Sequence, residues 1–273
     1  MAIENLINQG VLRVFEGGVI DNTTDCSLPL VALNRQLLDI SVEREDKVKL
    51  VIAAKTSVQS KVNISLAANA SLEVVVWLAA DSYLNLSVTQ AEGSSCKSFM
   101  AVTSSSDATV NFALNGHNAT NIFDALFVAT NSDHAKISLN TRHNVGDCSS
   151  KSLIKGVSAD KATGEFRGLV YVAPDAQRTD AQQQNRNIEL DNSHIIALPQ
   201  LEIYADDVRC SHGSTVGYAD ADALFYMRQR GLSQQEARRL QIVGFIEDVI
   251  SRCDIEPLCC LVDECVNEKL SKI

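Results

Sequence analysis

The sequence has few aromatic residues, few prolines and no long apolar run. Aromatic residues make up 5% of the 273 residues, and there are 4 prolines. No stretch approaches the roughly 18 consecutive apolar residues that a membrane-spanning helix needs. Residues 1–4 lack the basic segment that begins a secretory signal, and no long apolar stretch follows them. We therefore expect neither a membrane span nor an export signal.

An excess of basic residues is also lacking. The chain carries 24 Lys and Arg against 34 Asp and Glu, a formal net charge of −10. Because nucleic acids and anionic membranes attract positive charge, neither is expected as the main partner. No phosphate-binding loop of the GxxxxGK[ST] type occurs either, so the sequence predicts no ATP hydrolysis by this chain.

The eight cysteines are interpreted as reduced thiols because no export signal accompanies them, which predicts a cytoplasmic location. Four lie near the C-terminus: Cys253, Cys259, Cys260 and Cys265. Their spacing fits no CxxC pair of zinc or ferredoxin type. On a helix, Cys259 and Cys260 diverge by about 100°, so they cannot easily share one ion. We expect these four residues to be thiols without a metal.

Alternating apolar residues predict short β-strands from about Val48 to Leu139. The centres of these runs fall roughly 11–14 residues apart, so two runs make one coil of roughly 22–26 residues, a length typical of solenoids. Regularly interleaved helices are lacking, which disfavours an α/β fold. The pattern favours a mainly β fold, a stacked parallel β-helix, with a two-sheet sandwich as the alternative. The runs are Val48/Leu50/Ile52, Val62/Ile64/Leu66, Leu72/Val74/Val76/Leu78, Leu84/Leu86/Val88, Val110/Phe112/Leu114, Leu126/Val128 and Ile137/Leu139.

The pattern changes toward both ends of the chain. Residues 1–47 contain only short apolar pieces, and we expect strands to begin almost at the N-terminus. Residues 176–185 have no apolar face. After Gly217 the pattern becomes helical. The sequence therefore predicts a β-helix core over residues 1–217 and a small α-helical subdomain over residues 218–273.

Three helices are expected in this C-terminal part. Asp220 or Asp222 can cap the first, which stops at Gly231. Ser233 and Glu236 form a capping-box pattern for the second, and Pro257 opens the third. The second helix is expected to bury an apolar stripe of Ala237, Leu240, Val243 and Ile246. These helices either cover the end of the strand stack or dock a partner.

Cys210 and His212 are the candidate ligands of a metal or an iron–sulfur cluster. Two residues apart on a strand, they project from the same face. A thiolate and an imidazole can share an iron, zinc or iron–sulfur centre. The alternatives are a buried thiol beside a hydrogen-bonded imidazole, and a mononuclear metalloenzyme. A carbohydrate-active enzyme would need paired carboxylates, but the adjacent Asp206 and Asp207 point to opposite faces of a strand.

Several blocks over about 50 residues resemble the C-terminal signature of the SufB/SufD family, scaffold components of the Suf iron–sulfur cluster assembly machinery. The segment Cys210-Ser211-His212-Gly213 leans to SufD, since SufB proteins typically carry Glu-His-Glu there. The similarity extends more weakly back to about residue 140. By this resemblance we expect the chain to lack the N-terminal helical domain of full-length members. The blocks are Pro199-x-Leu201-Glu202-Ile203, Asp206-Asp207-Val208-x-Cys210-Ser211-His212-Gly213 and Leu224-Phe225-Tyr226-x-Arg228-x-Arg230-Gly231.

The resemblance implies a right-handed parallel β-helix and a non-catalytic scaffold role. It implies that the C-terminal helices bind SufC, an ABC-type ATPase, and that the last coil pairs with a SufB-like subunit or with a second copy. It also implies a transient iron–sulfur cluster at that interface, with His212 as a ligand and Cys210 beside it, and no tightly bound cofactor. The expected ATPase-docking residues are Phe225, Tyr226, Arg228, Arg230 and Gly231.

Overall fold

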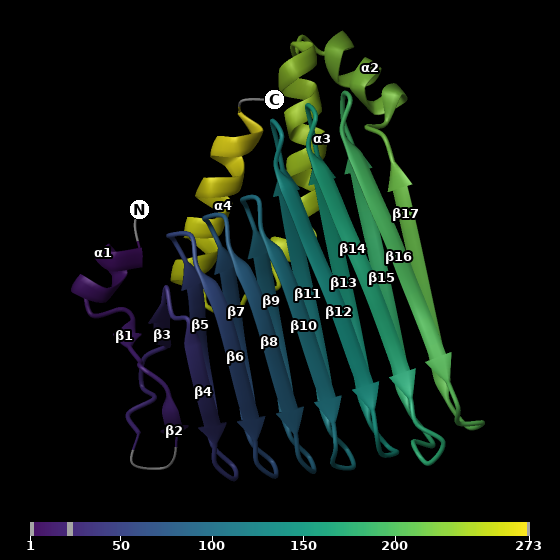
Figure 1. The fold of residues 1–273 in the computed structure, drawn as a ribbon. Helices are drawn as coiled ribbons and strands as arrows, with labels where there is room; N and C mark the ends of the chain where they lie inside the picture. Colours follow the sequence, from purple (N-terminus) through teal and green to yellow (C-terminus); the bar gives the residue numbers. More distant parts are fainter. Residues whose placement is uncertain (1–2, 21–23, 272–273) are drawn as a thin grey trace.

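The computed structural model describes residues 3–20 and 24–271, and within them the strands form two parallel sheets (Figure 1). The chain alternates between the sheets, so every strand pairs with the strand two places along. The odd sheet contains β1 (Arg13–Val14), β3 (Leu30–Leu33), β5 (Lys47–Ala54), β7 (Ser71–Leu78), β9 (Ser95–Val102), β11 (Thr120–Ala129), β13 (Ser149–Ser158), β15 (Asp180–Glu189) and β17 (Arg209–Gly217). The even sheet contains β2 (Gly18–Ile20), β4 (Leu37–Val42), β6 (Gln59–Leu66), β8 (Tyr83–Gln90), β10 (Asp107–Leu114), β12 (His134–His143), β14 (Thr163–Val172) and β16 (His194–Ile203).

The sequence distance between paired strands grows along the chain. Lys47 pairs with Ser71, 24 residues on, whereas Ser149 pairs with Asp180, 31 residues on. In the odd sheet the expected repeat of 22–26 residues therefore holds between β5 and β11, is too long for the pairings before β5 and is too short for those after β11. The strands lengthen from eight residues in β5 to ten in β13, and the connection from β14 to β15 is also longer than the one from β6 to β7.

The main core lies between the two sheets. Alternate side chains of each strand point inward, and the register stacks like on like, for example Leu50 against Val74 and Leu86 against Val110. Full burial of each such side chain contributes about 1.5–3 kcal/mol. Asn69, Asn118 and Asn131 adopt φ near +60° in the turns, a conformation that asparagine tolerates better than most residues. Gly116 is required at its turn, because a Cβ there would lie 1.9 Å from a backbone nitrogen of Glu92.

A second core covers the outer face of the odd sheet. Val51, Val75 and Phe99 point outward and pack under α1 (Ile3–Asn8), α3 (Gln234–Ile250) and α4 (Glu256–Leu270). The helices therefore lie against a sheet face, behind the strands in Figure 1, and the expectation that they cover the end of the stack is wrong. Leu126 and Val128, which the sequence predicted only as part of a strand, also pack in this outer core.

The helix boundaries agree with their sequence signals. Asp220 caps α2 (Ala221–Gln229), Ser233 and Glu236 form a capping box on α3, and Pro257 lies in the first turn of α4. Two expectations are wrong. The chain begins with helix α1 before its first strand, and Leu240, placed in the apolar stripe, is 52% exposed. None of the helices in the described residues is long and apolar enough to cross a membrane. The division into two domains at residue 217 stays a prediction.

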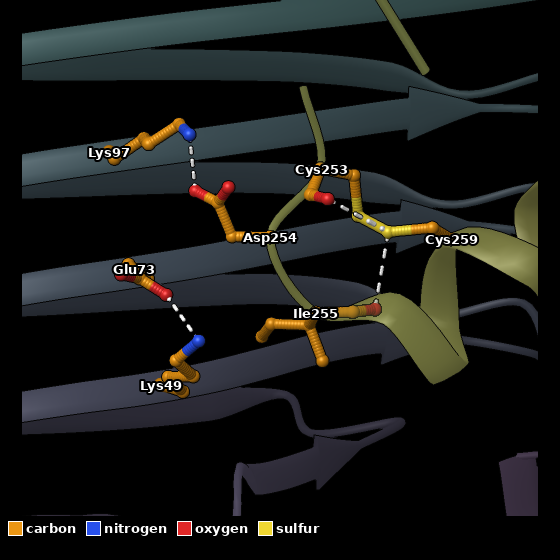
Figure 2. The surroundings of a disulfide bond; sticks show 7 residues. All are labelled: Lys49, Glu73, Lys97, Cys253, Asp254, Ile255 and Cys259. Carbon is orange, nitrogen blue, oxygen red and sulfur yellow. Dashed lines mark hydrogen bonds and ion pairs between the residues drawn. A yellow bond between two sulfur atoms is a disulfide. The ribbon is translucent and has the colours of Figure 1, made fainter. Parts of the chain in front are cut away.

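A disulfide joins Cys253 and Cys259 across the connection from α3 to α4 (Figure 2). The connection brings the two Cα atoms within 6.0 Å. Asp254, between them, forms an ion pair with Lys97 of β9, which fixes this connection to the odd sheet. The expectation of eight reduced thiols is therefore wrong for this pair, because it rested on the lack of an export signal and not on which cysteines the fold brings together. The cytoplasmic location that rested on it stays a prediction.

The two ends of the stack differ in how they expose strand edges. At the first end the outermost strands are β1 and β2, with two and three residues. At the other end they are β17 and β16, with nine and ten residues, and each pairs on one side only. Pro199 lies within β16, as befits an edge strand. Long exposed edges are available for pairing with another chain.

Candidate functional site

Cys210 and His212 lie on β17, at the open end of the stack. The register pairs them with Ala181 and Gln183 of β15, both of which are buried between the sheets. Cys210 and His212 therefore face the same side, continuous with the interior. Because no further strand of the described chain covers β17, His212 is exposed and Cys210 is half-buried. Their role as cluster ligands stays a prediction.

Burial raises the pKa of the Cys210 thiol, opposed by a hydrogen bond from the backbone of Ala181. The carboxylate of Asp180 adds to the rise. A thiol must lose its proton before it can bind a metal. Cys210 is therefore a protonated thiol at neutral pH in the free chain, and the charge of an arriving metal would have to favour its deprotonation. His212 needs only to be neutral, which makes it the readier ligand of the two.

The inner face of β15 is polar where earlier strands are apolar. Asn187 donates to the side-chain oxygen of Asn185 at 2.6 Å, and Ser214 of β17 donates to the same oxygen at 3.2 Å. Asn185 also donates to the backbone oxygen of Ile154. The Asn185 side chain therefore connects β13 on one side to the exposed strand β17 on the other.

Gln183 is the third inner amide of β15, and it differs from the other two. It is 1% exposed, and neither its Nε2 nor its Oε1 has a hydrogen-bond partner among the described residues. A buried polar group without a partner costs about 1–3 kcal/mol. Gly168 faces its amide, and a Cβ there would lie 2.5 Å from both amide atoms. Gln183 was not identified from the sequence, although the polar run of residues 176–185 was a signal that the inner side chains change from apolar to polar.

A groove of about 330 Å³ runs along β15 and β17 at this end. Gln183, His212 and Ser214 are among the residues that line it. The aromatic side chains of Tyr204 and Tyr218, just beyond β16 and β17, are 59% and 79% exposed. The end of the stack thus combines free strand edges, a polar inner strand and exposed aromatic surface.

Helix α2 has no buried residue. Phe225 and Tyr226 are 64% and 59% exposed. Arg230 donates to the Tyr226 hydroxyl at 2.8 Å and lies over its ring. Arg228 and Gly231 are exposed as well. The expected docking residues therefore lie on an accessible helix, which extends beyond the strands near β17 (Figure 1).

The other candidate residues are not brought into a site. Asp206 and Asp207 are exposed in the turn before β17. Cys260 is an exposed free thiol, and Cys265 packs partly into the outer core. Within residues 3–20 and 24–271, no group of three or more His, Cys, Asp or Glu residues could hold a metal ion. A mononuclear metalloenzyme and a carbohydrate-active enzyme are the alternatives to an iron–sulfur scaffold.

Comparison with known families decides between these readings. Residues 31–245 match the model of the family described as "SUF system FeS cluster assembly, SufBD core domain". The chain belongs to the SufBD family. This match confirms the resemblance found in the C-terminal blocks and extends it over most of the strand stack.

Curated SufBD relatives agree with the match. The chain is 39% identical to "Iron-sulfur cluster assembly protein SufD" of Escherichia coli (strain K12) over 137 residues, which are 50% of this chain and 32% of that protein. It is 37% identical over 135 residues to an "Iron-sulfur cluster assembly SufBD family protein" of Synechocystis, covering 49% of this chain and 29% of that protein. It is 35% identical over 102 residues to the SufD of Bacillus subtilis, covering 37% and 23%. The matches thus span about a third or less of these relatives.

Proposed function

We propose that this SufBD chain is a non-catalytic scaffold subunit for iron–sulfur cluster assembly, SufD-like in type. The observation that carries the proposal is the open end of the stack, where β17 presents His212 and Cys210 on a surface continuous with the interior. Membership of the SufBD family supports the general role. The iron–sulfur cluster is cargo in this proposal, held in passing and not bound permanently.

The fold proposed for the two parallel sheets is a right-handed β-helix. Strict alternation of the chain between the sheets supports it, since each pair of strands then forms one coil. The last coil, β16 and β17, is proposed to pair with a SufB-like subunit or with a second copy of this chain. Its unpaired edges and partly exposed apolar residues, among them Val216 and Ile203, support that surface.

The cluster is proposed to form at this paired surface, so that the partner supplies the remaining ligands. Two ligands from one chain do not complete an iron–sulfur site, and the described part of this chain groups no third one with His212. Exposure of His212 suits a ligand that must meet iron at a subunit boundary.

Helix α2 is proposed to dock a SufC-like ABC-type ATPase. The lack of buried residues in α2 and the aromatic and basic side chains on and just after it, Phe225, Tyr226, Arg228 and Arg230, support this assignment. Exposed aromatic and arginine residues are the types that dominate binding energy at protein interfaces. ATP hydrolysis would then belong to the partner.

The test is cluster content in a co-expressed complex. The chain is purified anaerobically with a SufB-like and a SufC-like partner, and iron and acid-labile sulfide are measured per complex. His212→Ala should lower both several-fold while the complex stays assembled. The matched control is His194→Ala, another exposed histidine of the last coil, which should leave both unchanged. Equal cluster content in the wild type and His212→Ala would contradict the assignment.

A further inference from the structure

Three inner amides of β15 lie beside three residues of β17 in register. Gln183 pairs with His212, Asn185 with Ser214 and Asn187 with Val216. Asn185 is hydrogen-bonded to its register neighbour, because the Ser214 hydroxyl donates to the Asn185 side-chain oxygen at 3.2 Å. Asn187 reaches β17 as well, donating to the backbone oxygen of Thr215 at 3.2 Å. Two of the three amides therefore bond to the exposed strand.

Gln183 is the amide that makes no such bond, although its register neighbour is a strong hydrogen-bonding group. Neighbouring strands in a sheet lie about 4.8 Å apart, so a glutamine side chain easily reaches the next residue of the ladder. The Gln183 amide itself occupies the space that a side chain at Gly168 of the even sheet would fill. His212 is exposed, so its ring can turn without displacing packed neighbours.

In the structure the Gln183 amide lies against Gly168 and bonds no other side chain of the described residues. We infer that Gln183 is a positioning residue, whose side-chain oxygen accepts a hydrogen bond from one ring N–H of His212 when the exposed ring turns toward it. That bond holds the imidazole in one tautomer, with the unprotonated nitrogen directed to the open end of the stack. Histidines that bind metals commonly donate their second N–H to an oxygen in this way, which fixes the ring and strengthens the ligand. Gln183 itself touches no cargo.

The inference deepens the proposed function, because it gives His212 a prepared orientation before any partner arrives. The hydrogen bond itself does not depend on the proposed function, which only gives the bond its role in metal binding. The tautomer of His212 is a property of the chain alone, so it can be measured without a partner, iron or sulfide. A failure of cluster binding would leave the tautomer result standing, and the reverse also holds.

The experiment measures the His212 tautomer ratio by long-range ¹H–¹⁵N NMR in the full-length chain labelled with ¹⁵N-histidine. The chain has 5 histidines, and His212 is assigned by the loss of its signals in His212→Gln. Spectra are taken at about pH 8, where histidines are neutral. One tautomer should predominate in the wild type, and Gln183→Leu should change the ratio by roughly fivefold, the effect of one ordinary hydrogen bond.

Three further variants sharpen the result. Gln183→Glu keeps the accepting oxygen and should keep the predominant tautomer, whereas Gln183→Met, a second apolar replacement, should behave as Gln183→Leu. The control is Gln184→Leu on the exposed outer face of the same strand, which should leave the ratio unchanged. An unchanged ratio in folded Gln183→Leu or Gln183→Met would overturn the inference, as would a loss of the tautomer in Gln183→Glu.

A double-variant cycle gives a second readout that does not depend on NMR assignment. Unfolding equilibrium constants are measured for the wild type, Gln183→Leu, His212→Leu and the double variant. If the two side chains bond, the change in the unfolding equilibrium constant of the double variant should differ roughly fivefold from the product of the two single-variant changes. Multiplicative effects would overturn the inference, since the two side chains would then be independent.

Discussion

Lys155 of β13 and Asp248 of α3 form an ion pair across the interface between the odd sheet and its helices. The Lys155 side chain is 5% exposed, and its ammonium also donates to the backbone oxygen of Phe245 and lies over the Phe245 ring. One buried lysine thus bonds α3 at two points. It is the polar anchor of a helix that otherwise packs through apolar residues.

Replacing Lys155 by alanine should destabilise the protein by about 1–3 kcal/mol. The change removes an ion pair and a charge-assisted hydrogen bond, both made by a lysine side chain that is 5% exposed. Urea unfolding measures the loss. The control is Lys49→Ala, which removes the more exposed ion pair with Glu73 on the same sheet and should cost no more than about 1 kcal/mol. Equal losses for the two variants would show that Lys155 is no anchor.

The Cys253–Cys259 disulfide should be detectable by counting thiols. Denatured without reductant, the chain should show six reactive thiols, and after reduction all eight. A bridge that closes so short a loop should stabilise the fold by about 2 kcal/mol, so reductant should lower the free energy of unfolding by that amount. Cys259→Ser should remove the response to reductant, whereas Cys260→Ser should keep it. Eight thiols before reduction would rule the bridge out.

Stability should fall in mildly acidic solution because of His143. Burial lowers the pKa of His143 to about 4, from its ordinary value of 6.5. The unfolded chain therefore binds this proton first as the pH falls. The contribution of a neutral His143 is complete above about pH 6.5 and is lost progressively down to about pH 4, by roughly 3 kcal/mol.

His143→Gln should flatten this part of the pH dependence, because glutamine does not titrate and can still bond Ser150, the hydrogen-bond partner of His143. Urea unfolding of both proteins at several pH values between about 7 and 4 makes the comparison. Groups common to both proteins cancel in the difference. Parallel pH profiles would mean that the pKa of His143 is the same in the folded and unfolded states.

Binding of a SufC-like ATPase to α2 should weaken when exposed aromatic and basic side chains of this helix are replaced by acidic ones. Phe225→Asp combined with Arg228→Glu should weaken co-purification at least about tenfold, as expected for interface residues of these types. Neither side chain is buried, so the fold should stay intact by circular dichroism. The matched control is Leu240→Asp, an exposed apolar residue on the neighbouring helix α3. Undiminished binding by the α2 variant would remove this helix from the interface.

The sequence predicted the strands well because the alternation of residues such as Leu72, Val74 and Val76 is a local signal. It also placed Cys210 and His212 on one face, which requires only an extended chain. The helix caps at Asp220 and Ser233 are likewise local. These features were predictable because each depends on neighbours within a few residues.

Other features depend on contacts between distant residues. Val74, Val76 and Leu78 were used as an alternating run in the sequence, whereas the structure also buries the intervening Val75 and Trp77 under the helices. Alternation alone did not show which face Leu126 and Val128 occupy. The Cys253–Cys259 bridge depends on the path of the connection, and the place of Gln183 depends on the register with β17.

Hydrogen exchange of the last coil tests the central claim most directly. Backbone amides of β16 and β17 are followed by mass spectrometry in the chain alone and in complex with a SufB-like subunit, or at concentrations where the chain associates with itself. Strong protection should appear over residues 194–217 on association, with little change in β1 to β3 at the opposite end. Association that protects another surface and leaves residues 194–217 exchanging as before would contradict the account.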